Sequence, residues 1–244
     1  MMTLSFIKEQ LMQWPPLVLE KALAIYIYGS VARGDGDADS DCDILVCLED
    51  CTVEELTALK AVVQELQEQW GYEFAFYSRS VLEAMQQKGS YFLWHIKMEG
   101  ILLYQTNDFM AQLLDTLPPY RGTAEDFTEY AEILSDVCSS ITEDPSASCY
   151  DLAVLATLAR NICIASCYLL GIMDFGRTGP VLKCMQYWGV HFPFTMDEYE
   201  ELYAYRLADT RGKPLNKPFP TSAFMIQWYK RVYTLLALAL TLIK

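Results

Sequence analysis

One stretch of the chain, residues 29–43, constrains the fold more than any other. It reads Gly-Ser-Val-Ala-Arg-Gly-Asp-Gly-Asp-Ala-Asp-Ser-Asp-Cys-Asp. An apolar run over residues 23–28 precedes it and another over residues 44–46 follows it, so we expect the stretch to join two buried strands. A small, flexible turn therefore stands a fixed distance before two carboxylates, Asp41 and Asp43.

The first residues of this stretch suit the binding of phosphate. Gly29 permits a sharp turn and has no Cβ that would block an anion. Ser30 adds a hydroxyl and a backbone N–H, and a helix beginning there would direct further N–H groups at the anion. The turn is therefore predicted to hold a phosphorylated ligand.

The two carboxylates suit a divalent cation. Asp41 and Asp43 are two residues apart on a predicted strand over 41–48, so both point to one face while Cys42 and Ile44 point toward a core. Carboxylates on one face repel each other unless a cation lies between them, and Mg²⁺ prefers oxygen ligands and phosphate. Two such ions, roughly 4 Å apart, could clamp the attacking and leaving oxygens of a phosphoryl transfer.

This arrangement resembles the signature of the polymerase-β-type nucleotidyltransferase superfamily, a Gly-Ser followed by Asp-x-Asp. The positions that match its smaller bacterial members are Gly29, Ser30, Ala32, Arg33, Gly34, Ser40, Asp41 and Asp43. The resemblance covers residues 20–105. It implies that Gly29, Ser30, Arg33 and Ser40 bind the nucleotide, that ATP is the donor and that two Mg²⁺ ions assist.

The family needs a third acidic residue on a neighbouring strand. Residues 70–78 are short and aromatic-rich, are interrupted by a glycine and are followed by an arginine, and Glu73 is their only acid. Similar antibiotic-modifying adenylyltransferases often carry glutamate here, and in some it also acts as general base. We expect Glu73 to complete the metal site with Asp41 and Asp43 or to deprotonate an acceptor hydroxyl; the alternative is an exposed strand acid without a role.

The surplus aspartates have a different interpretation. Together with Asp41 and Asp43, the side chains of Asp35, Asp37 and Asp39 alternate as in a calcium loop. Neither possible frame has glycine at the sixth position and glutamate at the twelfth, as an EF-hand requires. These three aspartates are therefore predicted to lie in a solvated loop.

Composition limits the partners. The 244 residues carry a net charge of −14, and residues 1–108 hold 17 acids against 7 bases. Such a surface repels nucleic acid and attracts a polycationic acceptor such as an aminoglycoside. No signal peptide is visible, the eight cysteines lack metal-binding or redox spacing, and the apolar run over 235–243 is too short to span a membrane. We expect a cytoplasmic monomer or homodimer that binds neither nucleic acid nor membrane.

The chain is predicted to have two domains. Strands and helices alternate over residues 1–108, which predicts an α/β (α+β) nucleotidyltransferase domain with a small mixed sheet. Within it, Thr52 and Glu55 form a capping-box pattern before a helix over 53–69. Residues 109–122 are expected to be a linker, and 123–244 an all-α helical bundle. Small antibiotic-modifying relatives bind the acceptor between two such domains.

The helical half carries candidate residues but no comparable motif. Its cations could reach the triphosphate and its aspartates could orient an acceptor; ordinary capping and surface charge are the alternative. The cations are Arg177, Lys183, Arg206 and Lys213, of which Lys183 is the nucleotide-binding candidate, and the aspartates are Asp174 and Asp209. Helical bundles fused or paired with such domains also include the HEPN ribonucleases, which need a histidine about five residues after an arginine. No histidine follows Arg160 within residues 163–170, which counts against that activity.

The predicted function is therefore Mg²⁺-dependent transfer of AMP from ATP to a hydroxyl of a small molecule, of the aminoglycoside or lincosamide kind, with release of pyrophosphate. Two alternatives stay open. One is AMPylation of a protein, as in antitoxin-type minimal nucleotidyltransferases, which are usually shorter single domains. The other is a catalytically silent, nucleotide-binding regulatory protein, against which the intact acidic residues count.

Overall fold

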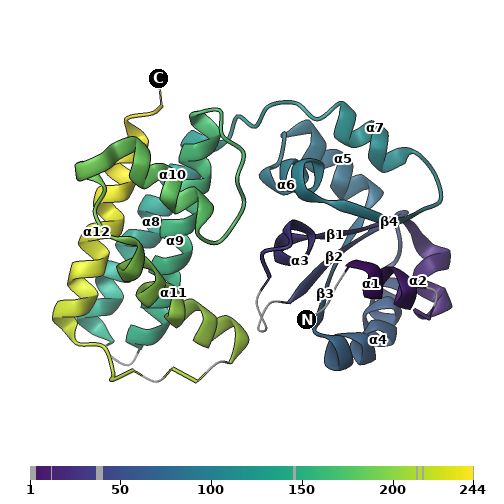
Figure 1. The fold of residues 1–244 in the computed structure, drawn as a ribbon, viewed down its shortest axis with the longest axis horizontal. Coiled ribbons are helices and arrows are strands. Elements are labelled where there is room, and N and C mark those ends of the chain that lie inside the picture. Colours follow the sequence, from purple (N-terminus) through teal and green to yellow (C-terminus); the bar gives the residue numbers. More distant parts are fainter. Residues whose placement is uncertain are drawn as a thin grey trace. The chain divides into compact units, whose positions relative to one another are not determined.

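The protein folds into two compact units, Met1–Arg121 and Gly122–Lys244 (Figure 1). The structure is a computed structural model that describes residues 4–11, 13–36, 41–144, 147–212, 214–215 and 217–243. Each unit has its own secondary structure: a sheet with helices in the first, and helices alone among the described residues of the second.

The first unit is built on a mixed sheet. Its strands are β1 (Ala22–Tyr28), β2 (Cys42–Leu48), β3 (Tyr72–Ser78) and β4 (Ile101–Gln105), in the order β3-β2-β1-β4. β2 and β3 are parallel, whereas β1 is antiparallel to both β2 and β4. The predicted α/β (α+β) architecture with a small mixed sheet is confirmed.

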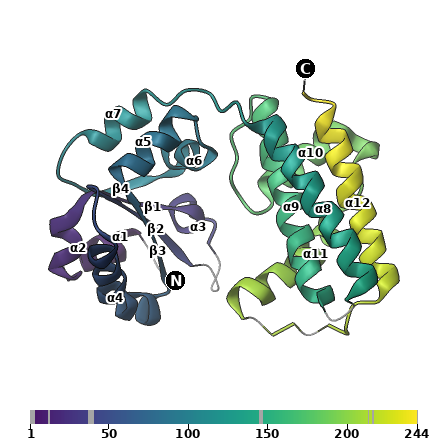
Figure 2. The same cartoon turned by 180° about the vertical axis from the view of Figure 1, so that it is seen from behind.

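Helices cover both faces of this sheet (Figures 1 and 2). On one side lie α1 (Leu4–Leu11), α2 (Pro16–Lys21) and α4 (Val53–Trp70); on the other lie α5 (Arg79–Gln87), α6 (Tyr91–Glu99) and α7 (Phe109–Asp115). The short helix α3 (Gly29–Arg33) connects β1 toward β2.

Alternation along the strands divides the apolar side chains between two cores. The first core consists of Ile7, Leu11, Trp14, Val18, Ala22, Ile25, Ile27, Cys42, Ile44, Val46, Leu48, Leu59, Val63 and Tyr72. The second core consists of Leu23, Ala24, Tyr26, Leu45, Cys47, Leu82, Leu93, Ile96, Met110, Leu113, Leu114 and Leu117. As expected, Cys42 and Ile44 are buried together in the first core, which turns Asp43 to the opposite face.

Local sequence signals explain several boundaries. The Thr52 hydroxyl accepts from the Glu55 N–H at 3.2 Å, and the Glu55 carboxylate accepts from the Thr52 N–H at 2.9 Å, so the predicted capping box begins α4. α1 ends at Leu11, before the predicted stop at Pro15-Pro16, and Pro16 begins α2 as its first helical residue. α7 lies within the predicted linker 109–122, because Met110, Leu113 and Leu114 are buried in the second core.

The second unit is a helical bundle. Its helices are α8 (Thr123–Glu143), α9 (Ser148–Leu169), α10 (Gly179–Trp188), α11 (Met196–Arg211) and α12 (Ser222–Leu240), with a 3₁₀ turn at Gly189–His191. α9 contacts each of the other four helices (Figure 2). It is long and apolar enough to cross a bilayer, but 61% of its apolar window is buried in the protein, as in the core helix of a bundle.

Candidate active site

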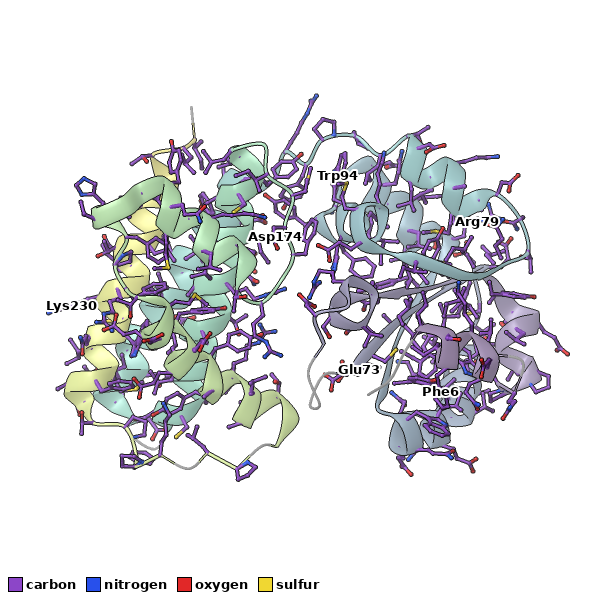
Figure 3. The ribbon with its side chains drawn as sticks, in the orientation of Figure 1. Phe6, Glu73, Arg79, Trp94, Asp174 and Lys230 are labelled. Carbon is purple, nitrogen blue, oxygen red and sulfur yellow. The ribbon has the colours of Figure 1, made fainter. Side chains whose placement is uncertain are left out.

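Strand register brings Asp43 and Glu73 together in the first unit. Asp43 is the Cα partner of Glu73 in the parallel β2–β3 pair and of Tyr28 in the antiparallel β1–β2 pair. Neighbours in register point to one face of a sheet. Asp43 is half-buried, and Glu73 is exposed near the first residue of β3 (Figure 3). The two carboxylates therefore stand side by side where β2 and β3 begin.

The turn after β1 meets this pair at Gly29. Gly29 is buried and has a φ of +71°, a conformation that side chains disfavour. A Cβ at this position would overlap the Oδ2 atom of Asp43 and lie 3.0 Å from its Cγ. The absence of a side chain thus allows the predicted phosphate-binding turn to approach the carboxylate of Asp43 directly.

Tyr28 adds a phenol beside the carboxylates. Burial raises the pKa of Tyr28, and the nearby charges of Asp43 and Glu73, together with Tyr77, raise it further. The Tyr28 side chain is therefore a neutral hydroxyl at physiological pH. Burial likewise raises the pKa of the Cys42 thiol to about 12, with a contribution from Asp43, so this cysteine is not a nucleophile.

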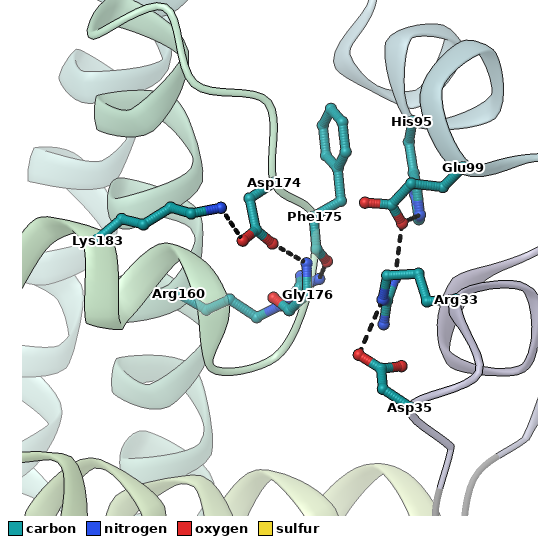
Figure 4. Close-up of polar contacts among 9 residues, drawn as sticks. All are labelled: Arg33, Asp35, His95, Glu99, Arg160, Asp174, Phe175, Gly176 and Lys183. Atoms are coloured by element: carbon teal, nitrogen blue, oxygen red, sulfur yellow. Dashed lines mark hydrogen bonds and ion pairs between the residues drawn. The ribbon is translucent and has the colours of Figure 1, made fainter.

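A partly buried ion-pair cluster flanks the turn (Figure 4). The Arg33 guanidinium at the end of α3 donates to Glu99 at 2.7 Å and to Asp35 at 3.0 Å. The His95 Nε2 atom lies 2.9 Å from the same Glu99 oxygen. Burial alone would raise the pKa of Glu99, but the contacts with His95 and Arg33 outweigh it and lower the pKa to about 2. Glu99 is therefore ionised.

The remaining predicted site residues are placed as follows. Ser30 lies in α3, half-buried, beside Gly29. Asp41 is half-buried immediately before β2. Ser40, with Asp37 and Asp39, lies outside the described residues. The structure thus brings Gly29, Asp43 and Glu73 to one end of the sheet, with Ser30 and Asp41 adjacent to them in the chain.

The donor set has the chemistry that Mg²⁺ prefers. Asp43 and Glu73 are carboxylates on one face of the sheet, and Asp43 adjoins the turn at Gly29. Across residues 4–11, 13–36, 41–144 and the described part of the helical unit, no group of three or more His, Cys, Asp or Glu side chains forms a metal cluster as it stands. The residues fit a magnesium site in type and in shared face, and the metal itself belongs to the proposal below.

The helical unit contains a separate pocket of about 440 Å³ between α8, α9 and α11. Small-molecule sites typically have volumes of about 300–1,000 Å³. The polar part of its lining includes Asp126, Glu129, Tyr130, Tyr150, Arg206 and Asp209. Three carboxylates against one guanidinium make the pocket acidic, and burial together with Asp126 and Glu129 raises the pKa of Tyr130 to about 12.

A loop of the helical unit contains the other candidates. The Lys183 ammonium donates to Asp174 at 2.5 Å, and Asp174 also accepts from the Gly176 N–H at 2.9 Å (Figure 4). The Arg160 guanidinium donates to the carbonyls of Phe175 and Gly176. These contacts fix the loop, and Lys183 as a nucleotide ligand stays a prediction.

Sequence reasoning missed Tyr28, His95 and Glu99. Tyr28 carried a signal, because it stands directly before the glycine of the motif. Glu99 carried none, since it is 66 residues from Arg33 and only the return of the chain through α6 brings them together.

The family comparison matches a large part of the first unit. Residues 18–109 match the family model described as "Polymerase beta, Nucleotidyltransferase". No curated protein sequence matches the chain.

Comparison with solved structures gives two matches of different strength. Spectinomycin adenyltransferase AAD(9) from Enterococcus faecialis, solved with ATP and spectinomycin, has a TM-score of 0.52 and 11% identity, and the match covers 96% of this chain and 99% of that one. A toxin-antitoxin solved with AMP-PNP has a TM-score of 0.32 and 18% identity over 54% of this chain and 98% of that one. The first match shows that the two-unit fold occurs in an adenyltransferase.

Residues 18–109 thus match a nucleotidyltransferase domain, and a helical region follows this domain in the chain. The fold of the chain resembles that of a spectinomycin adenyltransferase.

Proposed function

We propose that the protein transfers AMP from ATP to a hydroxyl of a small, cationic acceptor. The observation that carries this proposal is the junction of Gly29, Asp43 and Glu73 at one end of the sheet. The glycine turn would bind the phosphates of the donor nucleotide. The carboxylates on the shared face would hold the cations that stabilise charge in the transition state. Transfer of AMP to spectinomycin-like molecules is suggested by the fold of the adenyltransferase AAD(9).

The reaction balances without another reactant. The acceptor oxygen forms a bond to the α-phosphorus of ATP, and the bond between that phosphorus and the α–β bridging oxygen breaks, so pyrophosphate leaves with the electron pair. The acceptor proton passes to a base. Glu73 is the proposed base, or a metal ligand beside Asp43, because it is exposed at the site and adjoins Asp43 in register.

Asp41, Asp43 and Glu73 would hold Mg²⁺, of which two ions are proposed. When bound, Mg²⁺ neutralises charge on the phosphate oxygens. Gly29, Ser30, Arg33 and Ser40 are proposed to bind the nucleotide, with Lys183 as a further candidate. The Arg33 guanidinium also pairs with Glu99 and Asp35.

The acidic pocket of the helical unit supports a cationic acceptor. Asp126, Glu129 and Asp209 provide carboxylates for ammonium groups, and Tyr130 and Tyr150 provide flat surfaces for a ring. The net charge of −14 would favour the approach of a cation over that of a nucleic acid. Eight free cysteines are in keeping with a reducing compartment, so a cytoplasmic location is part of the proposal.

The test is pyrophosphate release from Mg·ATP with a panel of aminoglycosides, spectinomycin, a lincosamide and a cell lysate. Release that depends on one small molecule and yields its adenylyl derivative supports the proposal. Labelling of a lysate protein instead would support AMPylation. Nucleotide binding with no transfer to any acceptor would support a regulatory protein.

A further inference from the structure

We infer that Glu99 and His95 are positioning residues: they hold Arg33, and through it helix α3 and the turn at Gly29, against the end of the sheet that carries Asp43. The inference rests on the proposed function, because nucleotide binding is its readout. It assigns a role to two residues that contribute no atom to the reaction.

The first contact joins two helix ends. Arg33 is the last residue of α3, and Glu99 is the last residue of α6. Their side chains meet at 2.7 Å and are 21% and 15% exposed, so the pair is shielded from water much more than a surface ion pair. Asp35 lies on the same guanidinium at 3.0 Å but is 57% exposed. Glu99 is therefore the buried anchor of Arg33.

The second contact returns to the sheet. His95 lies 2.9 Å from Glu99, one turn earlier on α6. The rings of His95 and Tyr28 form a T-shaped pair, with an interplanar angle of 90° and centroids 5.4 Å apart. Tyr28 is the Cα partner of Asp43 and immediately precedes Gly29. The contacts thus form a closed path from the turn, through Arg33, Glu99, His95 and Tyr28, back to the start of the turn.

Helix α3 needs such an anchor. It has five residues, of which Gly29 alone is fully buried, and its N-cap residue makes no capping hydrogen bond through its side chain. Val31 and Ala32 are only partly buried against the first core. A helix this short is not stable by itself, so tertiary contacts must fix it. α3 packs against β1, β2 and α6, and the contact to α6 includes the Arg33–Glu99 pair.

Loss of the Glu99 charge would act on the turn more than on the fold. It would leave the half-buried guanidinium without its anchor, and a shielded charge that loses its partner moves to find another. The free end of α3 is what can move, because Gly29 at the other end is fixed beside Asp43. The nucleotide would then meet a turn that has to be ordered on binding.

The chain offers a matched control at the opposite end of the same strands. Arg79, labelled in Figure 3, donates to both carboxylate oxygens of Glu49 at 2.7 Å. Arg79 directly follows β3, and Glu49 directly follows β2. Glu49→Gln thus removes an arginine–glutamate ion pair in the same unit with the same N–O distance as the Arg33–Glu99 pair. This pair lies at the end of β2, far from the start of that strand.

The experiment measures the Kd for Mg·AMP-PNP, the KM for ATP and thermal unfolding for wild type, Glu99→Gln, Glu99→Asp, His95→Phe and Glu49→Gln. Glu99→Gln is expected to weaken nucleotide binding about tenfold. His95→Phe, which keeps the ring on Tyr28, should weaken it less. Glu99→Asp, which keeps the charge, should recover part of the loss. Glu49→Gln should leave Kd and KM unchanged.

The Arg33→Met and Arg33→Met/Glu99→Gln variants complete a cycle. Because the two residues are proposed to act as one unit, the double variant should bind nucleotide no more weakly than Arg33→Met. A Kd for Glu99→Gln within about twofold of wild type, or losses that simply add in the double variant, would overturn the inference. If the wild type itself binds no nucleotide, the proposed function fails and the inference fails with it; if the wild type binds nucleotide and Glu99→Gln binds it equally well, the inference alone fails. Should Glu99→Gln not fold, Glu99→Asp and His95→Phe carry the test.

Discussion

The carboxylate of Asp43 occupies the space in which a side chain on Gly29 would lie. Gly29 directly follows β1 and Asp43 lies on β2, so one contact joins the two halves of the motif. The two ends of the fifteen-residue stretch are therefore in contact, because the missing side chain at Gly29 makes room for the Asp43 carboxylate.

Gly29→Ala should abolish activity and destabilise the first unit. The alanine must adopt a positive φ, at roughly 1–2 kcal/mol, and its Cβ would also displace Asp43. Gly71→Ala is the matched control, because Gly71 has a φ of +65° and nothing within 4 Å of an added Cβ. The control should lose stability but keep activity, measured by urea unfolding and pyrophosphate release. Equal activity losses in the two variants would show that backbone strain alone is responsible.

Asp43→Asn and Glu73→Gln should each lower turnover at least about a hundredfold. Each substitution keeps size and removes one charge from the face where β2 and β3 begin, so stability should change little. The measurement is pyrophosphate release at saturating Mg·ATP, with Glu49→Gln as control. Full activity in Glu73→Gln would remove that residue from the site and leave it as an exposed strand acid.

Asp126→Asn and Asp209→Asn should weaken acceptor binding and leave ATP binding unchanged. Each removes a carboxylate from the pocket of the helical unit, and a lost charge-assisted hydrogen bond costs about 1.5–3 kcal/mol when the partner is a cation. Acceptor KM should therefore rise roughly tenfold or more, and added salt should raise it in the wild type as well. Glu132→Gln, an exposed acid on α8 that does not line the pocket, should leave acceptor KM unchanged.

The ion pairs of Glu99 should make the free energy of unfolding depend on pH. Its pKa is lowered from 4.5 to about 2 in the folded protein. A lowered pKa contributes stability that is present above the unfolded pKa and is lost as the carboxylate is protonated. The stability difference between wild type and Glu99→Gln should thus be present above about pH 4.5 and shrink as pH falls toward about 2. Urea unfolding across this range measures it; a difference that stays constant in acid would show that the ion pair is not formed.

The strands of the first unit were predictable from apolar runs bounded by glycine and polar turns, because a strand that is buried on both faces has a continuous apolar sequence. The capping box at Thr52 and Glu55 also followed, since its two hydrogen bonds involve residues three apart. Helices α2 and α7 were not predicted from the sequence. α2 is six residues long, and α7 depends on the second core, which no local pattern reveals.

The candidate site likewise has a part that could be predicted from the sequence and a part that could not. Gly29 and Asp43 were recognisable because one short stretch contains both. Pairing of Asp43 with Glu73 needed only the assumption that two predicted strands are neighbours. The contacts of Glu99 and His95 depend on where α6 lies against α3, and the pocket of the helical unit depends on three helices whose residues share no motif.

The most direct measurement of the central claim follows the α-phosphate. The protein is incubated with Mg²⁺, ATP labelled at the α-phosphate and each acceptor of the panel. The products are then separated and identified by mass spectrometry. Our account predicts one acceptor that gains a single AMP, with an equal amount of pyrophosphate, and loss of both products in Asp43→Asn. Release of phosphate or ADP in place of pyrophosphate, or label transfer that persists in Asp43→Asn, would contradict it.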